Sequence, residues 1–246
     1  VVVWAPDHHC EARFSDLFDY NGPVIEESFL DHAAQKGMRV YNYMEPEPGA
    51  EKNAHIDLNV DAGIYVRSAF VLNASPSTWD AENNFLRSLR PVEAVRDLVA
   101  QVRTPNDVSA HVRMVGGTDY EHLPYESRDN WTDDAHAMTD FWRRRSHFKH
   151  FMARIDTLIA EGRADRVFLA ADKPETYEAF VATYGDRMAY LPREVYDRSA
   201  EQLQYALADA ILLGSAPLLL GSTWSSFSEL ATRLSPTKIE IEMSGE

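Results

Sequence analysis

A glycine followed by a run of serines near the C-terminus has the residue types of an anion-binding loop. Residues 217–220 are apolar and predict a buried strand, Gly221 permits a tight exit from it, and the next helix is expected to begin at Ser225 or Ser226. Glu229 stands three residues after Ser226, which matches a capping box. The first N–H groups of a helix lack acceptors within the helix, and the helix dipole adds partial positive charge there. The segment therefore predicts a phosphate site, with an ordinary capped helix as the alternative.

Two other predicted strands end in side chains that could act on the same anion. His111 and Arg113 lie at the end of the strand predicted at 108–113, and Asp172 follows the strand predicted at 166–171. An arginine offers a permanent charge and a forked donor for phosphate oxygens, while a carboxylate accepts hydrogen bonds from the N–H edge of a purine such as guanine. Together they predict a site for a nucleoside diphosphate. The alternatives are a structural salt bridge for Arg113 and a helix N-cap for Asp172.

The order of the predicted elements explains how these segments could meet. After residue 105, strands are predicted at 108–113, 166–171, 188–191 and 217–220, and helices at 134–161 (bent near Ser146), 174–184, 200–213 and 226–234. This alternation favours an α/β fold with a doubly wound parallel sheet. Ligands of such sheets bind beyond the carboxyl ends of the strands, which is where Arg113, Asp172 and the serine-rich loop are expected.

The first part of the chain has weaker patterns of the same kind. Strands are predicted at 1–4, 38–43 and 64–72, short helices at 14–18 and 29–36, and a surface loop at 45–53. A helical stretch is predicted at 79–102, with Pro91 in the first turn of its second half. We expect this stretch to connect two domains.

Three motifs, in this order, resemble those of the fucosyltransferase superfamily, which includes the bacterial nodulation α1,6-fucosyltransferases, their animal relatives and the protein O-fucosyltransferases. The motifs are His111-Val112-Arg113, Phe168 to Asp172, and Gly221-Ser222 followed by Ser225-Ser226-Phe227-Ser228, within about residues 105–235. The resemblance implies a fold of GT-B type, with two Rossmann-like domains on doubly wound parallel sheets. It also implies a GDP-fucose donor, inversion at the sugar carbon, and no requirement for a metal ion or other cofactor.

The resemblance implies a role for each matching residue. Arg113 would be catalytic, because it would hold the donor phosphates and stabilise the departing GDP. His111 would lie near the base or ribose, and Asp172 would read guanine. The other nucleotide-sugar-binding residues would be Ser222, Ser225, Ser226 and Phe227. The chain contains no Asp-x-Asp triplet, which agrees with a transferase that needs no metal.

The chain departs from the family's pattern at two places. Met114 follows Arg113, whereas many α1,6-enzymes have a second arginine there, so the second phosphate contact is missing or comes from elsewhere. Relatives also have a glycine-containing loop after a first strand, and this sequence begins after the place where that loop would lie. We therefore expect an incomplete, acceptor-side Rossmann-like domain at 1–90 and a GDP-sugar-binding domain at 91–246.

These departures keep a second function open, that of a non-catalytic nucleotide- or carbohydrate-binding protein on the same scaffold. For the enzyme, the expected acceptor is a glycan or another small molecule with a free hydroxyl group. No spacing selects the general base that deprotonates this hydroxyl, and the candidates are Glu26, Asp119 and Glu121.

Composition limits the partners and the compartment. The chain has 246 residues and is 45% hydrophobic, as expected for a globular protein of one or two domains. Its formal net charge is −15, which disfavours non-specific binding to nucleic acid or to anionic membranes. Residues 210–221 are apolar but too short and too interrupted for a membrane span. With Cys10 as the only cysteine there is no internal disulfide, and we expect a cytoplasmic protein.

Three other polar features have structural interpretations that we favour. Asp7-His8-His9-Cys10 has metal-ligand residue types but no second cluster, so no metal site is expected. Arg143-Arg144-Arg145 is expected to be a solvated helix face, with contacts from the neighbouring Trp142, His147 and Phe148 to an acceptor sugar or GDP as the alternative. Asp209, in an apolar helix, is expected to form a buried hydrogen bond with the backbone.

Overall fold

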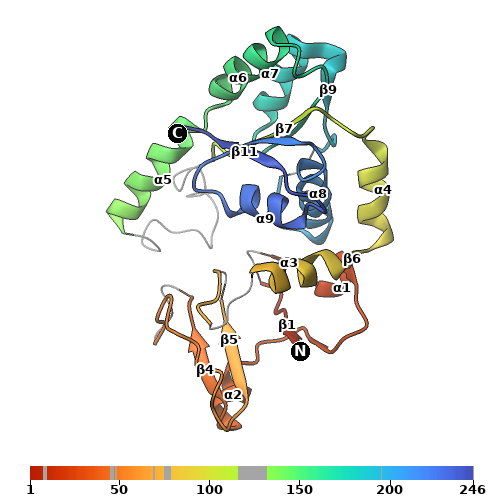
Figure 1. The fold of residues 1–246 in the computed structure, drawn as a ribbon. Helices are drawn as coiled ribbons and strands as arrows, with labels where there is room; N and C mark the ends of the chain where they lie inside the picture. Colours follow the sequence, from red (N-terminus) through yellow and green to blue (C-terminus); the bar gives the residue numbers. More distant parts are fainter. Residues whose placement is uncertain are drawn as a thin grey trace.

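The protein has a larger part built on one parallel sheet and a smaller part with short strands and helices (Figure 1). The computed structural model describes residues 1–7, 10–44, 47, 49–68, 70–74, 79–115, 132–194 and 196–245. The smaller part holds the N-terminus, and the larger part holds the C-terminus.

Five parallel strands form the sheet of the larger part. They are β7 (Val108–Val112), β8 (Val167–Ala171), β9 (Met188–Ala189), β10 (Leu218–Gly221) and β11 (Glu240–Met243), in the order β11-β10-β7-β8-β9. From β7 the chain adds β8 and β9 on one side, then returns to add β10 and β11 on the other. The strand order therefore reverses between β7 and β10, which confirms the predicted doubly wound sheet. Strand β11 was not predicted, because its glutamates give it the polar pattern of an edge strand.

Helices cover both faces of this sheet (Figure 1). One face carries α6 (Phe148–Ala160) and α7 (Pro174–Tyr184), and the other carries α4 (Glu93–Gln101), α8 (Ala200–Leu213) and α9 (Ser226–Leu234). The alternation of side chains along a strand divides the core. Val167 and Leu169 join the apolar cluster with α6 and α7, whereas Phe168 joins the cluster with Leu212 of α8. Fully burying a side chain of this size contributes about 1.5–3 kcal/mol.

The helices of the larger part largely follow the sequence pattern. Those predicted at 174–184, 200–213 and 226–234 are confirmed at both ends. The helix predicted at 134–161 is divided at the expected bend into α5 (Asp133–Arg145) and α6. At the break, the Ser146 hydroxyl lies 2.7 Å from Ser244 Oγ, and His147 caps the start of α6. The break directs α5 away from the sheet (Figure 1).

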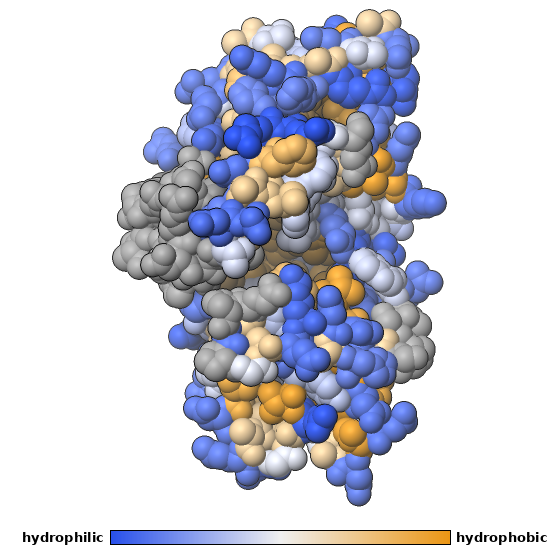
Figure 2. All heavy atoms as spheres, turned by 90° about the vertical axis from the view of Figure 1, so that its left-hand side faces the viewer, coloured by the Kyte–Doolittle hydropathy of each residue, from blue (hydrophilic) through white to orange (hydrophobic). Residues whose placement is uncertain are grey.

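The smaller part contains two separate pairs of parallel strands. β1 (Val2–Val3) pairs with β3 (Val24–Ile25), and β4 (Arg39–Asn42) pairs with β5 (Ile64–Arg67). Helix α2 (Leu30–Gln35) packs against β4 and β5, while α1 (Phe14–Leu17) contacts α8 of the larger part. Figure 2 shows apolar side chains at the surface of the smaller part, and its exposed apolar residues include Leu58, Phe70, Val71 and Leu72.

The connection between the two parts differs from the predicted helical stretch at 79–102. Helix α3 (Trp79–Ser88) ends before Arg90, and β6 (Arg90–Pro91) pairs antiparallel with β2 (Phe18–Asp19) before α4 begins at Glu93. The prediction that Pro91 lies in the first turn of a helix is therefore wrong. Proline is tolerated in short edge strands, and here the ladder continues through the Val92 N–H, which donates to the Leu17 carbonyl at 3.0 Å.

Candidate functional site

A cavity of about 450 Å³ opens at the carboxyl end of the central sheet. Its walls come from the ends of β7 and β8, the segment before α8 with α8 itself, the loop between β10 and α9, and α5. It therefore lies beside the point where the strand order reverses, the usual ligand position in doubly wound sheets. Six of the predicted site residues line it: His111, Arg113, Asp172, Ser225, Ser226 and Phe227.

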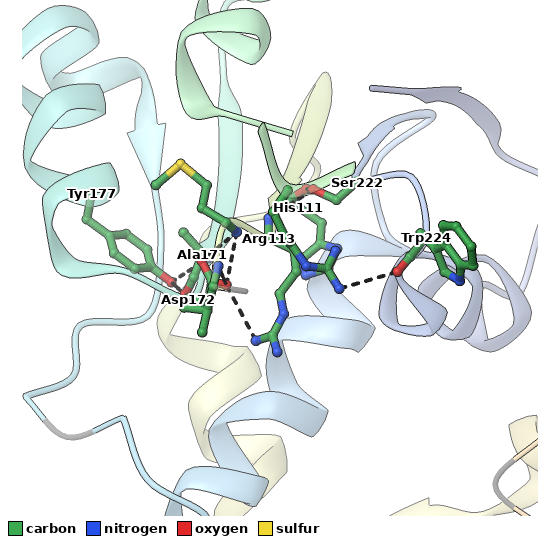
Figure 3. Close-up of polar contacts among 10 residues, drawn as sticks. His111, Arg113, Ala171, Asp172, Tyr177, Ser222 and Trp224 are labelled. Atoms are coloured by element: carbon green, nitrogen blue, oxygen red, sulfur yellow. Dashed lines mark hydrogen bonds and ion pairs between the residues drawn. The ribbon is translucent and has the colours of Figure 1, made fainter. Parts of the chain in front are cut away.

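Arg113 and Asp172 form an ion pair at the mouth of β7 and β8. Arg113 Nη1 lies 3.4 Å from Asp172 Oδ2, and both groups belong to neighbouring strands whose ends are in register (Figure 3). Asp172 Oδ2 also accepts the N–H groups of Met114 at 3.0 Å and Val115 at 2.8 Å. The carboxylate therefore holds the main chain that leaves β7 and orients the guanidinium. The salt bridge that the sequence left open for Arg113 is present, and the N-cap of α7 is Lys173 rather than Asp172.

His111 is buried and neutral. Its Nδ1 lies 2.8 Å from Ser228 Oγ, and its ring lies 4.9 Å from the ring of Phe227. Burial, reinforced by the charges of Arg113 and Arg143, lowers the pKa of His111 to about 3. The imidazole therefore contributes packing and hydrogen bonding to the site, but no positive charge at neutral pH.

Ser222 positions the main chain at the end of β7, next to the cavity, through hydrogen bonds of its hydroxyl group. It is fully buried, its hydroxyl donates to the His111 carbonyl at 2.8 Å, and it accepts the Arg113 N–H at 2.9 Å. The side chain thus ties the end of β10 to the end of β7, on either side of the point where the strand order reverses. Its predicted contact with a nucleotide-sugar stays a prediction.

Helix α9 begins beside the cavity. Ser225 is its N-cap, without a hydrogen bond from its side chain to the helix, and Ser226 is its first residue. The predicted capping box of Ser226 and Glu229 is therefore wrong, because Glu229 lies one position too far along the helix and its Oε1 is 3.9 Å from Arg233 Nη1. With Ser225, Ser226 and Phe227 lining the cavity, the positive end of the helix dipole lies at its wall.

Arg143 was missed by the sequence analysis. It lines the cavity, and its Nη2 lies 3.4 Å from the carbonyl oxygen of Trp224, which lines the cavity too. The interpretation of residues 143–145 as a solvated face is therefore wrong for Arg143, although Arg144 is exposed as expected. Successive helix residues point about 100° apart, so one basic run can supply both a cavity residue and a solvent-facing one.

A buried ion pair forms another wall of the cavity. Arg193 Nη2 lies 2.5 Å from Asp209 Oδ2, and the two side chains are 8% and 5% exposed. The prediction of a backbone partner for Asp209 is therefore wrong, and its partner is Arg193, a residue that no sequence pattern singled out. Burial raises the pKa of Asp209 to about 6 despite the cation beside it. Asp209 Oδ1 and Arg193 Nε are buried and have no hydrogen-bond partner among the described residues.

The charge of the cavity differs from that of the whole chain. Its described lining has four arginines and three aspartates, namely Arg113, Arg143, Arg193, Arg198, Asp172, Asp197 and Asp209. The chain as a whole has a formal net charge of −15. A locally cationic cavity in an acidic protein favours an anionic ligand at this place.

The remaining sequence candidates lie elsewhere. Glu26 is not among the lining residues, and its Oε1 accepts the Ser15 N–H at 3.3 Å. Asp119 and Glu121 fall in 116–131, and His8 and His9 likewise lie outside the described residues. Within the described ranges there is no group of three or more His, Cys, Asp or Glu side chains able to hold a metal ion. No described helix has the length and apolar character needed to cross a membrane.

Comparisons with known proteins agree with the fold. No family model and no curated protein sequence matches the chain. NodZ α-1,6-fucosyltransferase soaked with GDP-fucose matches with a TM-score of 0.57 and 16% identity, over 99% of this chain and 86% of that chain. Fucosyltransferase NodZ from Bradyrhizobium matches with a TM-score of 0.51 and 15% identity, over 92% and 78%. The chain thus has the GT-B fold of these fucosyltransferases, as the sequence motifs predicted.

Proposed function

We propose that this protein is a glycosyltransferase that transfers fucose from GDP-fucose to a hydroxyl group of a glycan or another small acceptor. The transfer inverts the sugar carbon and needs no metal ion. The observation that carries the proposal is the convergence of Arg113, Arg143 and the start of α9 on one cavity where the strand order reverses. The fold shared with the NodZ fucosyltransferases supports it.

The diphosphate of the donor fits between these three groups. Both guanidinium groups line the cavity, and both lower the pKa of His111, which lines it too. The first N–H groups of α9, with the hydroxyls of Ser225 and Ser226 beside them, add neutral donors to the two cations. An anion held in this way is neutralised by the protein's own side chains.

The same groups act on the reaction. As the bond between the anomeric carbon and the β-phosphate oxygen breaks, its electron pair stays on GDP, and the negative charge on the diphosphate grows. Arg113 and Arg143 are preorganised at that charge and lower the barrier, the work that a divalent cation does in other transferases. The acceptor hydroxyl attacks the anomeric carbon from the opposite face, which inverts it, and passes its proton to a general base. Among the described residues, none is selected for that base.

Recognition of the nucleobase involves the polar side of the cavity. The guanine-reading role of Asp172 stays a prediction, because its carboxylate already accepts two main-chain N–H groups. Asp209 and Arg193 also line the cavity and carry an acceptor and donors, the two types of group that pair with a purine edge.

Replacing Arg113 tests the proposal. Arg113→Ala is expected to abolish fucose transfer and to weaken GDP binding at least tenfold, because a hydrogen bond to a charged group contributes about 1.5–3 kcal/mol. Arg144→Ala is the control, since it removes the same charge from an exposed position. Transfer by the wild type is expected to be unchanged by EDTA. Normal transfer by Arg113→Ala would rule the proposal out.

A non-catalytic nucleotide- or carbohydrate-binding protein is the second candidate. Met114 favours it, because this residue stands where a second arginine would follow Arg113, and its sulfur instead accepts the Phe148 N–H at 3.4 Å. A thermal-shift series with GDP, UDP, ADP and their sugars separates the candidates when combined with a transfer assay. Stabilisation by GDP without hydrolysis or transfer of GDP-fucose over an acceptor panel would support the second candidate.

A further inference from the structure

Trp224 has an unusual backbone and an unusual exposure. It lies in the loop between β10 and α9, with a φ of 60°, in the left-handed region that a bulky side chain rarely adopts. Trp224 lines the cavity, and it is 60% exposed. A strained residue persists only where its surroundings hold it, and such residues cluster at functional sites.

Contacts on both sides hold the loop in this conformation. Arg143 Nη2 donates to the Trp224 carbonyl at 3.4 Å. The Thr223 N–H donates to Ser244 Oγ at 3.1 Å, and the Thr223 hydroxyl donates to the Ser244 carbonyl at 2.5 Å. Ser244 in turn contacts Ser146 at the end of α5. Residues of α5 and of the segment after β11 thus hold the backbone that carries the exposed indole.

The indole is backed by a second tryptophan. The rings of Trp142 and Trp224 lie 6.2 Å apart at 66°, in an edge-to-face arrangement. Trp142 packs in the same way on Phe141, at 5.1 Å and 81°, and the Arg145 guanidinium lies over the Phe141 ring at 4.5 Å. We call Trp142 and Trp224 the aromatic platform. An aromatic ring that already packs on a neighbour in the free protein lowers the entropic cost of binding.

The aromatic platform and the part of the cavity proposed for the nucleobase lie on opposite sides of the position proposed for the diphosphate. Figure 3 shows Asp172 and Tyr177 on one side of Arg113 and Trp224 on the other. Asp209 and Arg193 line the same cavity, and their charges act on Tyr177. Arg143 links the phosphate position to Trp224. A ring at the platform is therefore the group beyond the β-phosphate, rather than the base.

We propose that the aromatic platform binds a hexopyranose ring by stacking against the exposed face of Trp224. The inference rests on the proposed function, which brings two such rings to this end of the cavity, the donor's fucose and a sugar of the acceptor. The C–H face of a pyranose is apolar and planar enough to cover an indole, while its hydroxyl edge stays hydrated. A nucleobase needs donors and acceptors along its edge, and these lie on the side of Arg193 and Asp209.

Two substitutions separate the ring from the loop that carries it. Trp224→Gly removes the indole and accepts a φ of 60° without strain, whereas Trp224→Ala removes it and keeps the strain. Equal effects of the two variants on sugar binding identify the ring as the cause. An effect of Trp224→Ala alone would identify the loop conformation and overturn the proposal. Phe85→Ala is the control, because Phe85 is an exposed aromatic residue outside the cavity lining.

Calorimetry measures three affinities of each variant. The first is the affinity for GDP and the second is the affinity for GDP-fucose. The third is the affinity of the GDP-loaded variant for each member of a panel of methyl hexopyranosides. We expect the affinity for GDP to stay within about twofold of the wild type. A loss of about tenfold for GDP-fucose identifies the donor sugar as the occupant, and a similar loss for a methyl hexopyranoside identifies the acceptor sugar.

Other outcomes contradict the platform. If GDP and GDP-fucose lose the same affinity, the ring serves the nucleotide and the proposal fails. If the wild type binds GDP, and the variants bind GDP-fucose and the methyl hexopyranosides as tightly as the wild type does, the proposal for the platform fails and the proposed function is unaffected. If the wild type binds no GDP, the proposed function fails and the platform with it.

Discussion

Arg143 Nη2 lies 3.4 Å from the carbonyl oxygen of Trp224, which brings α5 into a site otherwise formed by the ends of β7 and β8, the loop between β10 and α9, and α8 with the segment before it. Helix α5 precedes the break at Ser146 and turns away from the sheet. The contact therefore depends on that break, since a continuous helix would carry Arg143 elsewhere. The contact holds Arg143 at the cavity that Arg113 also lines. Arg143 thus supplies a second cation to the site, although the residue that follows Arg113 in the chain is Met114.

Removing Arg143 tests this second cation. Arg143→Ala is expected to weaken GDP binding about tenfold, because it deletes a charged donor and releases the loop that carries Trp224. Arg144→Ala, one residue along and exposed, is expected to bind GDP as the wild type does. Isothermal titration calorimetry of the three proteins checks the difference. Equal weakening in both variants would assign the effect to net charge, against the geometry described above.

Asp172→Asn tests whether the carboxylate holds the β7 exit. The two oxygens accept main-chain N–H groups of Met114 and Val115, and an amide can offer only one oxygen in their place. We expect the free energy of unfolding to fall by about 1–3 kcal/mol and GDP binding to weaken. Urea unfolding gives the first quantity and calorimetry the second. A variant of full stability would show that these hydrogen bonds matter little.

The same variant also tests base recognition. If Asp172 reads guanine, wild-type protein prefers GDP over inosine diphosphate, which lacks the exocyclic amino group, and Asp172→Asn loses that preference. If the preference survives at lower overall affinity, the carboxylate acts on the loop alone.

His111 predicts a dependence of stability on pH. Its pKa is lowered to about 3 in the folded protein, so between about pH 6.5 and 3 the unfolded chain binds a proton that the folded protein does not. Stability is therefore lost as the pH falls below about 6.5, by up to about 1.4 kcal/mol per pH unit. His111→Gln removes this contribution. Urea unfolding at pH 7, 6 and 5 should give a shallower decline for the variant, and parallel curves would contradict the assignment.

The buried pair of Arg193 and Asp209 predicts a strong non-additivity. Asp209→Asn leaves the Arg193 charge buried without its partner, so we expect a loss of about 3–5 kcal/mol. The double variant Arg193→Met/Asp209→Leu replaces both charges with apolar side chains and is expected to lose less than Arg193→Met alone or Asp209→Leu alone. A double-mutant cycle by urea unfolding measures the coupling. Additive losses would mean that the two side chains act independently.

Local pattern was enough for much of the larger part. The predicted boundaries of α7, α8 and α9 agree with the structure because helix periodicity, Pro174 at a helix start and the N-cap Ser199 are local signals. The prediction for Pro91 is wrong because it rested on a local signal alone. Proline prefers the first turn of a helix, but pairing with β2, which is distant in the chain, sets the conformation of Pro91.

Spacing along the chain is enough to predict the alternation of strands and helices and to place Arg113, Asp172 and Ser225 at strand ends or helix starts. Parallel strands bring such ends to one edge of the sheet. The packing of distant segments is needed to bring Arg143 and Trp224 to them, to make Asp172 hold the backbone, and to pair Asp209 with Arg193. These contacts join residues that are distant in sequence, so their energies depend on how α5, the loop before α9 and the segment before α8 pack, which no local pattern encodes.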